Sequence, residues 1–439
     1  MRRLIAPVLV ALALVTALGA GVVALLNFRG EADIPATAAP FTPTPEQIAR
    51  GEYLVRAGNC IACHTARGSA PYAGGRAIPT PFGTIYSSNI TPDAKTGIGT
   101  WTPAHFWRAI HNGRSKDGRL LYPAFPYTEY TIITREDADA IFAYLWSLPA
   151  VDQPHRAHDL RFPYNNQAAL AVWRALFFEP MSFVPESARS AEWNRGAYLV
   201  RGLGHCIACH SARNVFGATS DLELTGGVIP EMGWYAPSLL STNEAGVADW
   251  PSADIVALLK NGVAPRGSAL GPMAEVVFRS TQYVSDADLN AIATYLKALP
   301  QAAPEDADRE GWWSWFRRQR AAPSLSAETR ARGAEIYKEQ CADCHGESGE
   351  GAVNAFPALA GNRAVTMRIP ANLIRIVLSG GFLPATQGNP RPYGMPPFSH
   401  VMNDADIAAV LSYVRASWGN DAPAVSALEV QQYRARRGR

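Results

Sequence analysis

Three short runs of sequence decide the fold of this chain: Cys60-Ile61-Ala62-Cys63-His64, Cys206-Ile207-Ala208-Cys209-His210 and Cys341-Ala342-Asp343-Cys344-His345. Together they use all six cysteines of the 439 residues. Two thiols at this spacing can each bond a haem vinyl group, and the adjacent histidine can then reach the iron. The pattern therefore predicts three covalent c-type haems and a protein that handles single electrons.

Zinc sites and redox dithiols also use Cys-x-x-Cys pairs. A zinc ribbon brings two pairs within a few tens of residues, whereas these pairs lie far apart in the chain. Each pair is also followed at once by histidine, and the βαβ setting of a thioredoxin-like dithiol is missing. Haem is therefore the better interpretation of all three runs.

The composition is that of an ordinary folded protein, with 48% hydrophobic residues and a formal net charge of +2. So small a charge gives no reason to expect a nucleic-acid partner. At ~150 residues per domain the length suggests about three domains, which agrees with three repeats. Since every cysteine belongs to a haem-attachment run, no disulfide indicates the cellular compartment.

The N-terminal stretch from Leu4 to Asn27 contains no charged side chain. As a helix it is long enough to cross a hydrocarbon core of ~30 Å. Arg2 and Arg3 precede it, so the positive-inside rule places the N-terminus in the cytoplasm and the haem domains on the periplasmic side of the inner membrane. A cleaved signal peptide is the alternative, although Ala36-Thr37-Ala38 lies far beyond the apolar run.

A helix with a clear start signal leads to each attachment run. Thr44-Pro45-Glu46-Gln47 offers a threonine N-cap, proline at the first helical position and glutamine three residues after the cap. Ser190 and Ser326 begin the same arrangement in the later repeats. Each repeat closes with an amphipathic helix, expected over 137–148, 286–299 and 404–418, with Tyr144, Tyr295 and Tyr413 on its apolar face.

Each repeat resembles a class I cytochrome c domain, and the order of the chain is similar to the three-haem cytochrome c subunit of membrane-bound bacterial dehydrogenases of the alcohol, aldehyde or gluconate type. The resemblance covers about residues 45 to 420. Its most specific stretches are Gly83-Thr84-Ile85-Tyr86, Asn89-Ile90-Thr91-Pro92-Asp93, Gly97-Ile98-Gly99-Thr100-Trp101, 193–200 and Ser280-Thr281-Gln282-Tyr283. It implies an all-α fold of three tandem cytochrome c domains behind an N-terminal transmembrane helix.

The expected domain boundaries follow from the repeats. The sequence divides into a membrane anchor or signal segment (1–30), a tether (31–43), domain 1 (44–150), a linker (151–189), domain 2 (190–300), a linker (301–325), domain 3 (326–420) and a basic tail (421–439). Both linkers are aromatic, with Trp173, Phe177 and Phe178 in the first and Trp312, Trp313, Trp315 and Phe316 in the second. Packing is the favoured role for most of them, and docking of a partner or the membrane is the alternative.

A sixth ligand to the iron is usually a methionine in a loop before the closing helix. The family pattern assigns this role to Met273 in the second repeat and Met395 in the third, with Met402 as a rival better suited to packing. The first repeat has Phe125 there, and phenylalanine cannot bind iron. Haem 1 is therefore expected to be five-coordinate or to take a ligand from elsewhere, among His105, His111, His155, His158 and Met181.

These features predict an electron-transfer subunit with no catalytic residues of its own. The resemblance implies a partner dehydrogenase catalytic subunit that oxidises an alcohol, aldehyde or sugar acid, with electrons passing to ubiquinone or a terminal oxidase of the respiratory chain. One alternative is a haem enzyme of the peroxidase type that uses an open haem 1. Another is a freestanding multihaem carrier or oxidase subunit.

Overall fold

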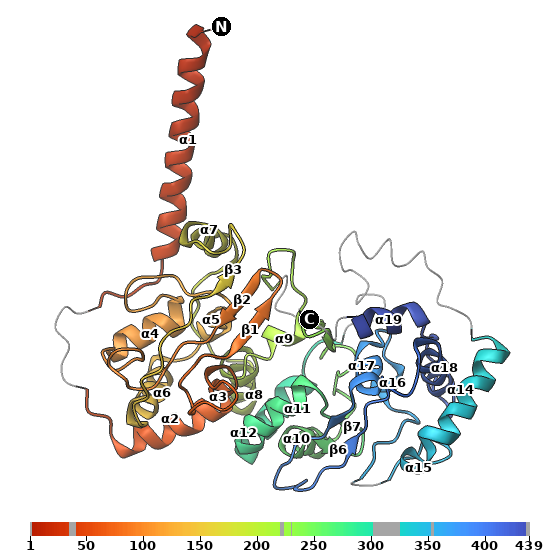
Figure 1. Cartoon of the computed structure of the whole chain (residues 1–439). Coiled ribbons are helices and arrows are strands. Elements are labelled where there is room, and N and C mark those ends of the chain that lie inside the picture. Colours follow the sequence, from red (N-terminus) through yellow and green to blue (C-terminus); the bar gives the residue numbers. More distant parts are fainter. Residues whose placement is uncertain are drawn as a thin grey trace. The chain divides into compact units, whose positions relative to one another are not determined.

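The computed structural model describes residues 2–34, 41–219, 224–229, 231–301, 325–352 and 355–435 (Figure 1). The chain forms two compact units. The first comprises residues 1–185 with the short segments 201–205 and 215–218, and the second comprises 186–200, 206–214 and 219–439. The aromatic second linker, with Trp312 to Phe316, lies outside the described residues.

The N-terminal apolar stretch forms helix α1 (Arg2–Phe28), as the sequence predicts. Within it, Ile5–Phe28 is long and apolar enough to cross a membrane, and its most apolar stretch of 18 residues is not buried in the protein. In the described part of the chain it is the one helix that meets these criteria.

Three pairs of crossing helices carry the repeats. In the first unit α2 (Pro45–Ala57) packs on α6 (Arg135–Ser147). In the second unit α8 (Ala191–Tyr198) packs on α12 (Asp286–Lys297), and α14 (Ala327–Gln340) packs on α18 (Asp404–Arg415). The predicted N-caps are confirmed, because the side chains of Thr44, Ser190 and Ser326 each accept a hydrogen bond from the first turn of the helix that follows.

A glycine in each opening helix allows the two helices to cross closely. A Cβ at Gly51 would meet Ala140 O at 1.9 Å, one at Gly196 would meet Ala291 O at 2.0 Å, and one at Gly333 would meet Ala409 O at 2.3 Å. The predicted closing-helix tyrosines, Tyr144, Tyr295 and Tyr413, also contact these glycine positions. The three repeats therefore share one packing geometry.

Shorter helices complete the two units. In the first unit these are α4 (Pro103–Asn112), α5 (Tyr127–Tyr130) and α7 (Gln167–Phe177). In the second unit these are α10 (Ser252–Asn261), α11 (Pro272–Arg279), a 3₁₀ turn (Thr281–Tyr283), α16 (Arg363–Thr366) and α17 (Ala371–Ser379). A π-helix (Leu199–Leu203) follows α8 directly in the chain.

The fold is mostly helical but not all-α. Strands β1 (Ala77–Thr80), β2 (Gly83–Tyr86) and β3 (Asp159–Leu160) form an antiparallel sheet in that order. Three two-stranded ribbons lie in the second unit: β4 (Gly227–Ile229) with β5 (Trp234–Ala236), β6 (Val263–Ala264) with β7 (Gly267–Ser268), and β8 (Gly381–Phe382) with β9 (Gly394–Met395). Strands of two to four residues are too short to show the alternation by which a sequence reveals a strand.

Part of the segment expected as a basic tail (421–439) is folded. Ala427–Ala435 form helix α19, which packs on α17 and α18, and Val430 is fully buried there. The Arg434 guanidinium Nε lies 2.6 Å from Asp404 Oδ1, and its Nη1 donates to Ser399 O. Apolar burial and an ion pair hold this segment, which the arginine-rich composition alone did not indicate.

Candidate haem-attachment sites

Each Cys-x-x-Cys-His run folds as a short helix: α3 (Cys60–His64), α9 (Ile207–His210) and α15 (Ala342–His345). The first cysteine of each run is half-buried and the second is exposed, and no cysteine forms a disulfide. The chain turns sharply before the first two runs, because Asn59 and His205 have positive φ angles of 53° and 37°. The paired thiols of each run thus lie on one short turn and form no disulfide.

The three histidines share one hydrogen bond that the sequence did not reveal. His64 Nδ1 lies 2.7 Å from Ser88 O, His210 Nδ1 lies 2.7 Å from Pro237 O, and His345 Nδ1 lies 2.9 Å from Pro357 O. A backbone carbonyl can only accept, so each Nδ1 carries the proton and donates it. This bond fixes the tautomer in which Nε2 has a free lone pair.

Burial keeps these imidazoles neutral. Desolvation is the main cause that lowers the pKa of His64, His210 and His345 below the usual histidine value. A neutral imidazole with Nδ1 bonded to a carbonyl is the form in which histidine binds a metal through Nε2. Paired thiols that form no disulfide, beside such a histidine, fit a covalently bound haem. Among the described residues no cluster of three or more His, Cys, Asp or Glu side chains offers a metal site of another kind.

Arginines support the attachment turns of the first two repeats. An Arg76 guanidinium nitrogen donates to Ala62 O, and Arg213 Nη2 donates to Ala208 O at 2.6 Å. Ala62 and Ala208 occupy the same position in their runs, directly before the second cysteine. Neither arginine was predicted, because each lies outside the motif and meets it only after the chain has folded back.

His205, which directly precedes the second attachment run, is part of the first unit and contacts residues of that unit. Its Nε2 lies 3.3 Å from Gly58 O, and Tyr130 Oη donates to the same carbonyl at 3.2 Å. The rings of Tyr130 and His205 meet edge to face, with 5.5 Å between centroids. Since Gly58 stands two residues before Cys60 and His205 directly precedes Cys206, this contact links the segments that lead into the first two runs.

The methionines expected as sixth ligands in the second and third repeats have different surroundings. Met273 is half-buried in the first turn of α11, which follows the positive-φ Gly271. Met395 is half-buried in β9 beside the apolar core of the third repeat. Met402 is buried inside that core, at 7% exposure, so the packing role expected for it is confirmed.

The first repeat places aromatic rings in the corresponding loop. The Phe125 ring lies 5.6 Å from that of Tyr130 and 6.4 Å from that of Tyr127. Tyr122, at the start of the loop, meets the His158 ring edge to face at 5.3 Å. His158, whose Nδ1 also accepts a hydrogen bond from the Tyr86 amide, is thus an alternative ligand that contacts the loop, through Tyr122.

The other four alternative ligands have separate places in the fold. His105 bonds Thr102 at the N-cap of α4. His111 is buried and stacks on Trp107. His155 is exposed beside His158, and the Met181 amide donates to the Thr131 hydroxyl.

Comparison with known proteins identifies the family. Residues 48–149 and 330–418 match the family described as cytochrome c. The chain is 40% identical over 399 residues to the cytochrome c subunit of a quinone alcohol dehydrogenase from Gluconobacter oxydans (strain 621H), covering 88% of this chain and 82% of that protein. The corresponding subunit from Komagataeibacter europaeus is 38% identical over 409 residues, covering 91% and 86%.

A relative from another dehydrogenase gives the same result. The gluconate 2-dehydrogenase cytochrome c subunit of Pantoea cypripedii is 38% identical over 399 residues, which cover 88% of this chain and 89% of the relative. Each of these matches spans about nine-tenths of this chain. This chain therefore belongs to the cytochrome c subunits of dehydrogenase complexes, and it carries electrons rather than catalysing substrate oxidation.

Proposed function

We propose that this chain binds three haem c groups and passes electrons between them. Cys60 and Cys63, Cys206 and Cys209, and Cys341 and Cys344 would form the thioether bonds, with His64, His210 and His345 as proximal ligands. The observation that carries the proposal is the hydrogen bond from each histidine Nδ1 to a backbone carbonyl, present in all three runs. Three unrelated metal sites would not be expected to share this hydrogen bond.

The bound haem supplies an iron that gains and loses one electron. The protein's own part is to orient each imidazole through Nδ1, which also raises the basicity of Nε2 and so tunes the reduction potential. The proposed arrangement is three cytochrome c domains, over 44–150, 190–300 and 326–420, each built on one glycine-mediated helix crossing.

The proposed sixth ligands are Met273 for haem 2 and Met395 for haem 3. Their half-burial leaves part of each side chain without a protein contact, which suits a thioether that must reach an iron. Haem 1 differs, because Phe125 occupies the corresponding loop. A haem without a thioether ligand has a lower potential, since sulfur ligation favours reduced iron.

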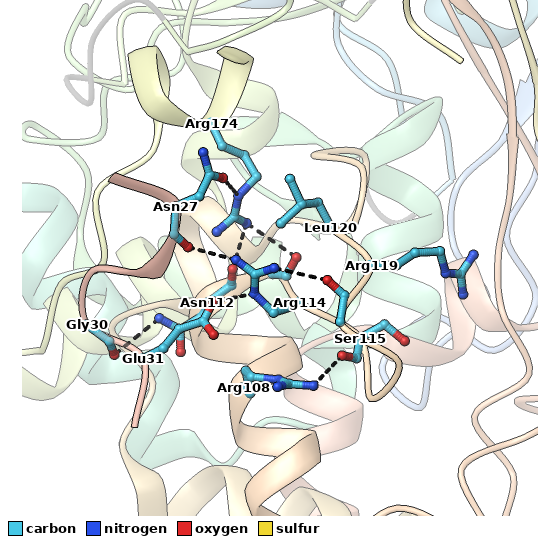
Figure 2. A network of polar contacts seen from close by, with 12 residues as sticks. Asn27, Gly30, Glu31, Arg108, Asn112, Arg114, Ser115, Arg119, Leu120 and Arg174 are labelled. Atoms are coloured by element: carbon cyan, nitrogen blue, oxygen red, sulfur yellow. Dashed lines mark hydrogen bonds and ion pairs between the residues drawn. The ribbon is translucent and has the colours of Figure 1, made fainter. Parts of the chain in front are cut away.

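We further infer that α1 is an uncleaved membrane anchor, with the haem domains on the periplasmic side. Figure 2 shows that its C-terminal end enters a buried polar network. Arg114 Nε lies 2.5 Å from Glu31 Oε1, with both side chains about nine-tenths buried, and Arg114 Nη2 donates to Asn27 O. Arg174 Nε donates to Asn27 Oδ1 at 2.9 Å.

Cleavage that removed the C-terminal end of α1 and Glu31 would leave two buried arginines short of hydrogen-bond and ion-pair partners. Arg114 and Arg174 are 7% and 3% exposed, and an uncompensated buried charge costs several kcal/mol. A signal peptide, by contrast, leaves the mature domain and contributes nothing to its interior. The network therefore supports retention of α1.

The proposed electron donor is the catalytic subunit of a dehydrogenase, and the proposed acceptor is ubiquinone or a terminal oxidase. The relatives named above are subunits of alcohol and gluconate dehydrogenases, which supports the donor class. Purification from membranes in mild detergent tests the proposal. We expect a dehydrogenase subunit to accompany the chain, and its substrate to reduce the haems; a chain that purifies alone and stays oxidised would contradict it.

The number of bound haem groups can be measured separately. The intact mass of the purified chain should exceed that of the polypeptide by three haem groups. A Cys341→Ala/Cys344→Ala variant should lose one group and keep the other two. A mass increase of fewer than three groups in the fully matured parent chain would overturn the assignment.

A further inference from the structure

Helix α7 exposes an apolar face that none of the described residues covers. Its sequence, Gln167 to Phe177, has one charged residue, Arg174, and that side chain is 3% exposed. The solvent-facing stripe consists of Ala168, Val172 and Leu176, at the spacing of four residues that lines one side of a helix. Val172 is 47% exposed and Leu176 68%.

A surface helix ordinarily carries its polar residues on the outside. In α7 this order is reversed, because the charged residue points inward and the apolar stripe outward. Arg174 donates to Asn27 Oδ1 and to Asn112 O, so its inward orientation is fixed by the network that holds α1. The apolar stripe therefore cannot turn inward without breaking that network.

A neighbouring loop extends the apolar face. Val215 is 77% exposed and Phe216 is 53% exposed. Trp173 Nε1 donates to Phe216 O at 3.0 Å, and the Phe177 and Phe216 rings lie 5.9 Å apart. We call Val172, Trp173, Leu176, Phe177, Val215 and Phe216 the α7 patch.

The α7 patch adjoins the end of the apolar span. Asn27 Nδ2 donates to Ala171 O at 2.8 Å, and the Arg29 guanidinium donates to Phe178 O. Figure 1 shows α7 beside the end of α1 that enters the first unit. On α1 itself Leu25 is 72% exposed and Phe28 60%, so apolar surface continues from the span toward this region.

We propose that the α7 patch lies in the membrane interface and that α7 is a second, monotopic contact with the bilayer. Its occupant is the lipid into which α1 inserts, because the hydrogen bonds from Asn27 and Arg29 hold α7 at the depth where the span ends. Interfacial helices bury their apolar face about 5–10 Å into the headgroup region, and tryptophan is favoured at that level. This inference rests on the proposed retention of α1.

Contact of both α1 and α7 with the membrane would restrict rotation of the first unit. A single spanning helix leaves a domain free to rotate about the helix axis, whereas α7 would fix one side of the first unit against the lipid. The attachment turn of the first repeat belongs to that unit. The orientation of the proposed haem 1 relative to the membrane plane would then be set by the protein.

Thiol accessibility in nanodiscs tests the proposal. With all six native cysteines bonded to haem, Leu176→Cys supplies the one free thiol of the full-length chain. Val401→Cys is the matched control, since Val401 is 67% exposed in the second unit. Each variant is reconstituted in nanodiscs of phosphatidylethanolamine and phosphatidylglycerol and treated with an anionic water-soluble thiol reagent or a lipid-dissolved maleimide.

We expect the water-soluble reagent to label Leu176→Cys at least tenfold more slowly than Val401→Cys, and the lipid-dissolved maleimide to label it readily. Equal aqueous rates would overturn the proposal. Slow reaction of Leu176→Cys with both reagents would also overturn it, because a protein surface would then cover the patch. The intact mass of each sample reports separately whether α1 is present, so loss of the anchor is distinguished from failure of the patch.

Discussion

Gly51 lies so close to Ala140 that a Cβ added to Gly51 would meet the Ala140 carbonyl oxygen at 1.9 Å. A carbonyl oxygen in a helix is held by its own hydrogen bond and cannot move aside like a flexible side chain. The same relation recurs at Gly196 and Gly333. The glycine is thus what allows the opening helix to cross the closing helix so closely.

Substitution of this glycine should destabilise the first repeat. We expect Gly51→Ala to cost about 1–3 kcal/mol of unfolding free energy through overpacking, although alanine is the better helix former. Ala49→Gly, two residues earlier on an exposed face of α2, is the matched control and should cost about 1 kcal/mol through helix propensity alone. Chemical denaturation followed by haem absorbance measures both. A more stable Gly51→Ala variant would show that the helices can separate without cost.

The third repeat offers two methionines for a direct comparison of ligation and packing. Met395→Leu should abolish the methionine-ligated spectrum of one haem and lower its potential, because leucine has no donor atom. Met402→Leu should leave the spectrum unchanged and cost less than about 1.5 kcal/mol, as volume-conserving core changes do. A redox titration with optical detection separates the two. An identical spectrum in Met395→Leu and the parent would refute the assignment.

In the first repeat a methionine can be added instead of removed, and the haem potential should then shift in the opposite direction. Phe125→Met places a thioether in the loop where the other repeats have one, so we expect one haem potential to rise and the other two to stay. The control is Phe125→Leu, which removes the ring without adding a donor. If the methionine variant titrates like the leucine variant, the loop does not approach the iron of haem 1.

The sequence predicted the helices of each repeat because its signals are local. Thr44, Ser190 and Ser326 could be recognised as N-caps from the residues that follow them, and all three cap helices. The motif also marked His64, His210 and His345. It could not identify Ser88, Pro237 and Pro357, since these residues act through carbonyl oxygens that every residue possesses.

Long-range contacts account for the other differences. Val430 and Arg434 are ordinary residues of a basic terminus in the sequence, and only the folded third repeat shows that one is buried and the other pairs with Asp404. Arg174 lies in the aromatic first linker, where nothing in the sequence marks it as buried. Its hydrogen bond to Asn27 joins positions 147 residues apart, a separation at which no periodicity gives a signal.

The buried ion pair between Glu31 and Arg114 supplies the sharpest test of the anchor. Glu31→Gln removes one partner and leaves a buried guanidinium short of its counter-charge, so we expect the first unit to lose about 3–5 kcal/mol. The same change should loosen the end of α1 and expose the bond after Arg29, whose guanidinium is otherwise held by Phe178 O. Trypsin treatment of membranes should then release haem-containing protein faster than from the parent.

Asp33→Asn is the control for this variant, because Asp33 lies two residues further along and is exposed. It removes the same charge from the same segment without breaking a buried pair, so both stability and the rate of release should match the parent. Equal release from the Glu31→Gln and Asp33→Asn membranes would mean that the network does not hold the anchor. Faster release from Glu31→Gln alone would show that the first unit is fixed to α1 through Arg114.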